Sequence, residues 1–102
     1  MIAVLTHHWT KTGKLYDGRR LLERNGLAQS RVRGFVNRRT FYSMPDPTKI
    51  TTVVLWESND IYDLWKNSPE RVEAMAGSEE LWSKLPESEK FEVGKEVLSS
   101  IY

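Results

Sequence analysis

The stretch ITTVVLW, residues 50–56, is the clearest strand signal in the chain. It is rich in β-branched and aromatic residues, which favour strands. Because side chains alternate between the two faces of a strand, Val54 and Trp56 share one face while Val53 and Leu55 share the other. Both faces therefore carry large apolar side chains. Any fold for this chain must cover both faces of this strand.

The segment before this strand predicts its hairpin partner. Residues 34–42 (GFVNRRTFY) alternate as a strand does, and the turn that follows contains Pro45 and Pro47, so no ladder of backbone hydrogen bonds passes through it. A connection this short makes the two strands an antiparallel hairpin. Strict alternation places four side chains on one face of the second strand: Phe35, Asn37, Arg39 and Phe41.

The segment upstream of the hairpin predicts a strand and a helix. Residues 2–9 (IAVLTHHW) are rich in strand-forming residues. Residues 14–24 have the apolar spacing of a helix, and Asn25-Gly26 is typical of a helix C-terminus. We therefore expect the helix to end there, with residues 27–28 adding at most a short second turn.

The segment downstream of the hairpin predicts two short helices and a last strand. Ser58 or Asn59 caps the first helix, and Ser68-Pro69 starts the second. The last apolar stretch, residues 91–101, follows a break at Gly77-Ser78, and a fourth strand is expected near residues 89–93. The order β-α-β-β-α-β predicts an α+β, ferredoxin-like fold: one antiparallel sheet with helices on one face.

The size and composition of the chain bound its organisation. Its 102 residues fit one domain, 1–102, and its 39% hydrophobic and 28% charged residues are an ordinary globular balance. A chain this short cannot cover the second face of the sheet itself, so we expect a homodimer in which two sheets pack together. There is no cysteine, apolar span of about 20 residues or signal-peptide pattern, so we expect a cytoplasmic protein.

The net charge of +1 hides an asymmetry between the two halves of the chain. Residues 1–51 carry ten Lys and Arg against three Asp and Glu, whereas residues 52–102 carry five against eleven. This pattern favours halves that face each other, within one chain or across a dimer. The alternative is a basic patch for an acidic ligand or nucleic acid.

Four segments of the chain carry a family resemblance. KTGK at residues 11–14 resembles the turn after strand one, and RGFV at residues 33–36 resembles the opening of strand two. LWES at residues 55–58 resembles the end of strand three, and WKNSPE at residues 65–70 resembles the helix that follows. In this order they are similar to the antibiotic-biosynthesis-monooxygenase family of dimeric α+β barrel proteins.

The resemblance implies a pocket between the sheet and the helices. The family includes cofactor-independent oxygenases of polyphenolic and anthrone-like substrates, quinol oxygenases and haem-degrading enzymes. It therefore implies a small oxygenase with no cofactor acting on an aromatic, polyphenolic or quinol substrate. The alternative is a non-catalytic, dimeric domain of the same fold that binds a small molecule or serves as an accessory.

The two histidines, His7 and His8, are the candidate catalytic bases because histidine titrates near neutral pH. Adjacent strand residues point to opposite faces, so one should face the pocket and the other the dimer side. The resemblance places His7 near the pocket-facing polar position, and we favour His7 over His8. The alternative is a hydrogen-bonded histidine at a strand end. Because they point to opposite faces, His7 and His8 cannot bind one metal ion together.

Four further residues are candidates for substrate binding. The resemblance puts Trp65 at the place of a tryptophan that lines the substrate cavity, a role compatible with core packing. The others are Trp9, Asn37 and Arg39. Asn37 and Arg39 could bind ligand oxygens, or they could instead pair with the acidic half of the chain or lie at the rim of the sheet. Trp56 is interpreted as core.

Several function classes are not expected. Haem-degrading members ligate iron with a histidine in the helix after Trp65, and residues 71–76 (RVEAMA) contain none. Residues 33–36 superficially resemble an RNA-recognition signature, but the aromatic spacing that should follow is missing, so no nucleic-acid partner is expected. Phosphate-binding loops and common hydrolase motifs are absent from the sequence. We expect no metal, no cofactor and no membrane partner.

Overall fold

A computed structural model describes residues 1–100 of the chain. The predicted domain 1–102 and the predicted apolar stretch to Ile101 thus extend beyond the described residues. The element order is β-α-β-β-α-α-β, with one short 3-10 turn. The elements are β1 Ile2–Trp9, α1 Leu15–Gln29, β2 Phe35–Tyr42, β3 Lys49–Trp56, α2 Asn59–Lys66, α3 Pro69–Ala74, the turn Ser78–Glu80 and β4 Glu87–Glu92.

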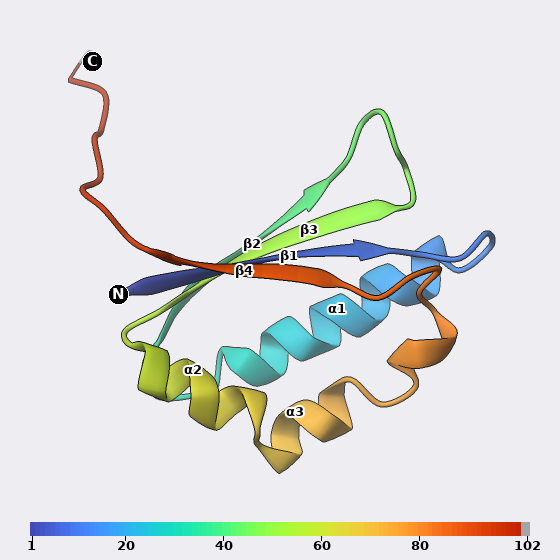
Figure 1. The fold of residues 1–102 in the computed structure, drawn as a ribbon, viewed down its shortest axis with the longest axis horizontal. Coiled ribbons are helices and arrows are strands. Elements are labelled where there is room, and N and C mark those ends of the chain that lie inside the picture. Colours follow the sequence, from blue (N-terminus) through green and yellow to red (C-terminus); the bar gives the residue numbers. More distant parts are fainter. Residues whose placement is uncertain (101–102) are drawn as a thin grey trace.

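The four strands form one sheet in the order β2-β3-β1-β4, and every neighbouring pair is antiparallel. The helices lie together on one face of this sheet (Figure 1). We call the covered side the helix face and the other side the open face. The predicted α+β, ferredoxin-like fold class is therefore confirmed. No helix within residues 1–100 is long and apolar enough to cross a membrane.

The core lies between the helix face and the helices, and it has two clusters. Alternate residues of β3 point into it, and Ile50 and Trp56 have no exposed surface. Burying a large apolar side chain contributes about 1.5–3 kcal/mol, so these residues anchor the sheet to the helices. The first cluster contains Val4, Val54, Trp56 and Trp65, and the second contains Leu21, Leu22, Ile50 and Trp82.

Helix α1 ends later than the sequence predicts. The helix runs unbroken through Asn25 and Gly26 to Gln29, so the predicted C-cap is wrong. Asn25 is buried, and a Cβ at Gly26 would lie 2.8 Å from Nε of Arg38. The side chain of Arg38 thus passes close to the helix backbone at Gly26, a long-range contact that local sequence cannot show.

Strand β2 contains an irregularity that changes which face its first residues occupy. Its pairing with β3 shifts between Phe35, opposite Trp56, and Asn37, opposite Leu55. A bulge of this kind adds a residue to one strand and reverses the alternation. Phe35 therefore packs edge-on against Trp56, with ring centroids 5.7 Å apart, and does not share the face of Asn37 and Arg39 as predicted.

The two helix starts agree with the sequence. The side chain of Ser58 accepts a hydrogen bond from the backbone N–H of Ile61, and that of Ser68 accepts one from Arg71, with Pro69 in the first turn of α3. These side chains satisfy N–H groups that have no partner within a helix. Strand β4 begins at Glu87, two residues before the predicted start.

No helix within residues 1–100 covers the open face (Figure 1). Phe41 and Phe91 remain 51% and 43% exposed there, beside the half-buried Leu5 and Val53. The single ion pair among residues 1–100, Lys84 with Glu87, joins two residues of the acidic half. The basic and acidic halves are therefore not linked by ion pairs within the described part of one chain.

Candidate functional site

Two cavities on the helix side of the sheet adjoin Trp65. The inner pocket, of about 320 Å³, lies between the helix face and the helices, and residues of β1, β2, β3 and α1–α3 line it. The outer groove, of about 700 Å³, lies on the outside between α1 and the α2–α3 segment. Although the groove is larger, three of the four buried side-chain polar atoms without a partner in residues 1–100 belong to residues that line the inner pocket; the fourth is Nε of Arg19.

His8 lines the inner pocket. It is only 6% exposed, and its Nδ1 atom is buried with no hydrogen-bond partner among the described residues. Burial, with smaller contributions from Arg38, His7 and Arg71, lowers the pKa of His8 from 6.5 to about 4. His8 is therefore a neutral imidazole at physiological pH, and one of its nitrogens is a free hydrogen-bond acceptor.

His7 lies on the opposite side of the sheet. Its Nδ1 is 2.7 Å from Oγ1 of Thr51, and its ring lies 5.9 Å from that of Trp9 on the open face. The expectation that His7 faces the pocket is therefore wrong, while the expectation that the two histidines face opposite sides is confirmed. Alternation alone leaves the choice open, because the helices decide which face becomes the pocket.

Arg38 of β2 is a pocket residue that the sequence analysis missed. Its Nη1 donates to Oε1 of Gln29 at 2.7 Å, and its Nη2 donates to the backbone oxygen of Leu22 at 2.8 Å. Burial lowers the pKa of Arg38 to about 10, so the guanidinium still carries its charge at neutral pH. Alternation predicts that Arg38 lies on the face opposite to Asn37 and Arg39. Because the bulge in β2 shifts the register after Phe35, the sequence does not show that this is the helix face.

Two further polar atoms at the inner pocket have no partner among residues 1–100. They are Oδ1 of Asn25, on α1, and Nε1 of Trp56, at the end of β3. Both side chains are more than 90% buried. A buried polar atom left unpaired costs about 1–3 kcal/mol, so both atoms call for a water or a ligand in the pocket. Trp56 is thus core, as interpreted, and also pocket wall.

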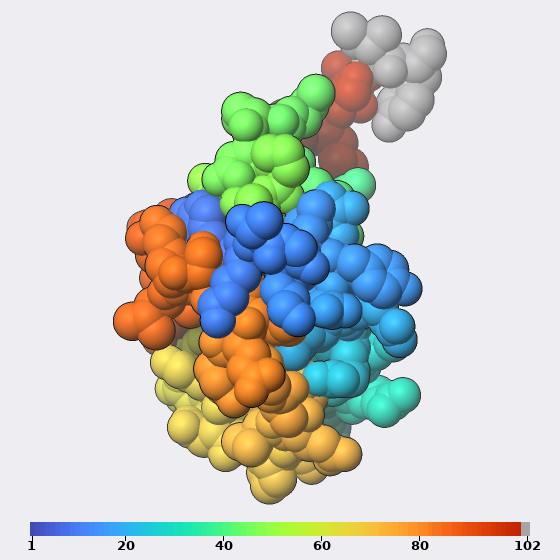
Figure 2. Space-filling model, turned by 90° about the vertical axis from the view of Figure 1, so that its right-hand side faces the viewer, coloured from blue at the N-terminus to red at the C-terminus, as the bar shows by residue number. Residues whose placement is uncertain are grey.

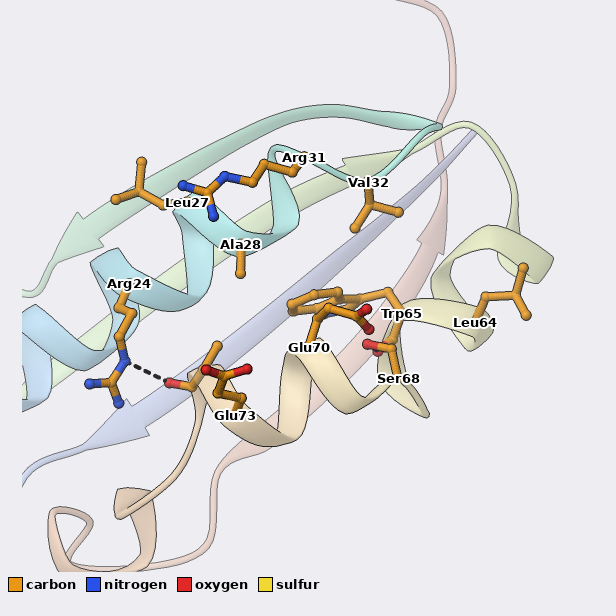
Figure 3. A pocket seen from close by; sticks show the side chains of 11 residues that line it. Arg24, Leu27, Ala28, Arg31, Val32, Leu64, Trp65, Ser68, Glu70 and Glu73 are labelled. Atoms are coloured by element: carbon orange, nitrogen blue, oxygen red, sulfur yellow. Dashed lines mark hydrogen bonds between the residues drawn. The ribbon is translucent and has the colours of Figure 1, made fainter.

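Trp65 separates the two cavities. It is 3% exposed and stacks on Trp56, with ring centroids 6.3 Å apart and planes inclined by 26°. It lines both the inner pocket and the outer groove. In Figure 3 its indole lies across the floor of the groove, and Ala28 of α1 points toward it. Trp65 is thus a cavity wall, and its role in substrate binding stays a prediction.

The other three predicted binding residues lie on the open face. Trp9 packs beside His7 there, and Asn37 and Arg39 pair with Leu55 and Val53 and are exposed. They are therefore not brought together with Trp65, and none of the three lines the inner pocket or the outer groove. The reason is again parity: on these strands, the residues next to them in sequence point toward the helices.

One end of the inner pocket is closed by the segment before β4. Thr10 and Trp82 form an isolated bridge, and Lys11 donates its N–H to the oxygen of Leu81 at 2.8 Å. Figure 2 shows this segment packed against the turn that follows β1. Trp82 is thereby held against His8, with ring centroids 4.7 Å apart.

The charged side chains that line the outer groove are exposed, unlike the two arginines of the inner pocket. Arg24 of α1 donates from Nε to the backbone oxygen of Ala74 at 3.1 Å, which ties α1 to the end of α3 (Figure 3). The remaining charged side chains of the groove, Arg31, Glu70 and Glu73, are exposed. No cluster of three or more potential metal ligands of the His, Cys, Asp or Glu type occurs within residues 1–100.

The fold of this chain is similar to that of known proteins. No protein-family model matches the sequence, and no curated protein matches it significantly. Among solved structures, the chain is similar to SnoaB, described as a cofactor-independent oxygenase from Streptomyces nogalater, with a TM-score of 0.85, 12% identity and coverage of 96% of this chain and 97% of that one.

Two other solved structures are described as putative antibiotic biosynthesis monooxygenases. The one from Deinococcus radiodurans has a TM-score of 0.85 and 13% identity, covering 97% of this chain and 98% of that one. The one from Nitrosomonas europaea has a TM-score of 0.83 and 13% identity, covering 91% and 98%. The chain therefore has the fold of the antibiotic biosynthesis monooxygenases.

Proposed function

We propose that this chain is a small oxygenase that acts on a phenolic, polyphenolic or quinol substrate in the inner pocket and uses no metal or prosthetic group. The observation that carries the proposal is the neutral, buried His8, whose Nδ1 has no partner, in a pocket that also holds Arg38 and Arg71. The fold shared with a cofactor-independent oxygenase supports it.

The proposed chemistry begins with an enolisable ring bound against Trp65. His8 accepts a proton from the substrate, and the positive charge that Arg38 and Arg71 bring to the pocket favours an anionic substrate. The anion itself then gives electrons to dioxygen. For an anthrone, a ring CH₂ and one O₂ become a C=O and one H₂O, so the substrate supplies all the electrons that reduce the second oxygen atom.

The low pKa of His8 fits a base that works only when the substrate is bound. In the empty pocket, burial and the two arginines oppose a charged imidazole. When an anion forms beside it, the imidazolium gains an opposite charge and its pKa rises. Proton transfer is therefore favoured only together with formation of the substrate anion.

The test is dioxygen uptake by the chelator-treated protein with a panel containing 1,8-dihydroxyanthrone and reduced naphthoquinones. We expect uptake above the rate without protein, and a loss of that excess in a folded His8→Gln variant. Absence of excess uptake with every member of the panel would contradict the proposal.

A second candidate function is ligand binding without turnover. The observation that favours it is that the unpartnered atoms of Asn25 and Trp56 can hydrogen-bond a ligand but perform no chemistry themselves. A panel compound that raises the melting temperature without dioxygen uptake would support this function over the first.

We also propose that the protein works as a homodimer through the open face. One row of paired residues crosses the sheet as Arg39, Val53, Leu5 and Glu89. The row is apolar at its centre and has opposite charges at its two ends. A two-fold axis near its centre would bring Arg39 close to Glu89 of the partner subunit. Such interfaces typically bury about 2,000 Å² or more.

A further inference from the structure

The inner pocket has two positive side chains and almost no negative ones. Arg38 enters from β2 and Arg71 from α3, so the two guanidinium groups belong to opposite walls. Glu79 is the one carboxylate that lines the pocket; it is exposed and within ion-pair distance of neither arginine. Within the part of the chain that the structure describes, the pocket thus carries uncompensated positive charge.

The hydrogen bonds of Arg38 do not remove this imbalance. Its partners, the amide oxygen of Gln29 and the backbone oxygen of Leu22, are neutral. A buried charge is costly unless it is paired with an opposite charge, and neutral acceptors meet only part of that cost. No side-chain hydrogen bond of Arg71 to a protein group is seen in the described residues, so its guanidinium also has donors to spare.

The other residues of the inner pocket indicate which further groups a ligand would carry. Trp56, Trp65 and Trp82 line it with aromatic surface, which suits a flat ring. The free Nε1–H of Trp56 calls for a further ligand acceptor and the free Oδ1 of Asn25 for a ligand donor. A neutral phenol would offer one oxygen and leave at least one arginine without an anionic partner.

We infer that the natural ligand enters the inner pocket already as an anion, as an aromatic carboxylate whose carboxylate group is held by Arg38 and Arg71. The inference rests on the proposed function and deepens it, because the hydroxyl that would lose its proton to His8 is a second group on the same ring. The carboxylate provides binding and orientation, while His8 acts at the hydroxyl end. Charged hydrogen bonds of this kind are the strong ones in proteins.

The test compares pairs of ligands that differ only in charge. The probes are 2-naphthoate with 2-naphthamide, and 3-hydroxy-2-naphthoate with its amide, titrated by calorimetry into the full-length protein at pH 7.5. We expect each carboxylate to bind about 10- to 100-fold more tightly than its amide, the range of one charged hydrogen bond. Equal affinities within both pairs, or no binding of either carboxylate at about 1 mM, would overturn the inference.

Variants assign the effect to the two arginines. Arg71→Met and Arg38→Met should each reduce carboxylate affinity about tenfold or more and leave amide affinity unchanged, whereas Arg38→Lys should keep part of the preference. Arg33→Met is the control, because Arg33 is exposed and lines neither cavity. Arg71 is half-buried on α3, so its variant should fold even if Arg38→Met does not.

A carboxylate preference that survives in folded Arg71→Met and in Arg38→Lys alike would place the anion elsewhere and overturn the assignment. Because these titrations need no turnover, they are independent of the oxygenase proposal. Carboxylate binding without dioxygen uptake would leave this inference standing and refute the proposed reaction, and uptake with neutral ligands alone would do the reverse.

Discussion

The imidazole of His8 lies against the indole of Trp82, with ring centroids 4.7 Å apart and planes inclined by 44°. Trp82 is in turn held by its bridge to Thr10 and by close contact with Gly18 of α1. Residues from three parts of the sequence thus meet at one ring and keep it out of water. This contact makes His8 a neutral group, and the pH dependence of stability follows from it.

Stability should fall as the pH is lowered through the range from about 6.5 to 4. His8 has a pKa of about 4 in the folded chain and about 6.5 when unfolded, so the unfolded state binds more protons in this window. The loss should reach about 3 kcal/mol at the acid end. Urea unfolding of the parent and His8→Gln at a series of pH values measures it, and the carboxylates common to both cancel in the difference. Parallel curves for the two proteins would contradict a depressed pKa of His8.

The two histidines should behave differently in any turnover assay. His8→Gln should lower kcat/KM by about 10²-fold or more, the usual contribution of a general base, because His8 is the histidine in the pocket. His7→Gln removes the contact with Thr51 on the open face and should leave the rate within a few-fold. Loss of activity in His7→Gln with a normal rate in His8→Gln would reverse the assignment.

Gly18→Ala should destabilise the protein although Gly18 lies inside a helix. Helix propensity alone favours alanine by about 1 kcal/mol. The added Cβ would lie 2.6 Å from Cγ2 of Thr10 and 3.0 Å from Cζ3 of Trp82, both buried, so we expect a net loss of about 1–3 kcal/mol. Thermal unfolding measures the change. Gly94→Ala is the control, because a Cβ there meets nothing within 4 Å; a stabilised Gly18→Ala would contradict the packing described.

A charge exchange should reveal the dimer interface. Arg39→Glu and Glu89→Arg place like charges at the two ends of the row that crosses the open face, and each should weaken dimerisation about tenfold or more. The double variant should recover most of the loss, since the opposite charges again meet. Sedimentation over a range of concentrations measures the dissociation constant. Purely additive losses would reject this pairing, and a parent that is a folded monomer at micromolar concentration would reject the dimer.

Local pattern determined most of the secondary structure. The alternation and β-branching of residues 50–56 identified β3 within one residue, and β1 was placed at its observed bounds. Ser58 and Ser68-Pro69 marked two helix starts, because a capping side chain bonds to a backbone group only a few residues away. Where the determining interactions are this short-ranged, one sequence is enough to specify them.

Only the tertiary structure decided which residues share the pocket. Alternation is symmetric, so it gives His7 and His8 opposite faces without saying which face the helices cover. The bulge in β2, which turns Arg38 toward the helices, and the passage of its side chain across Gly26 depend on residues far apart in the chain. The sequence therefore determined that one histidine would lie in a pocket, and long-range packing decided that it is His8, with Arg38 beside it.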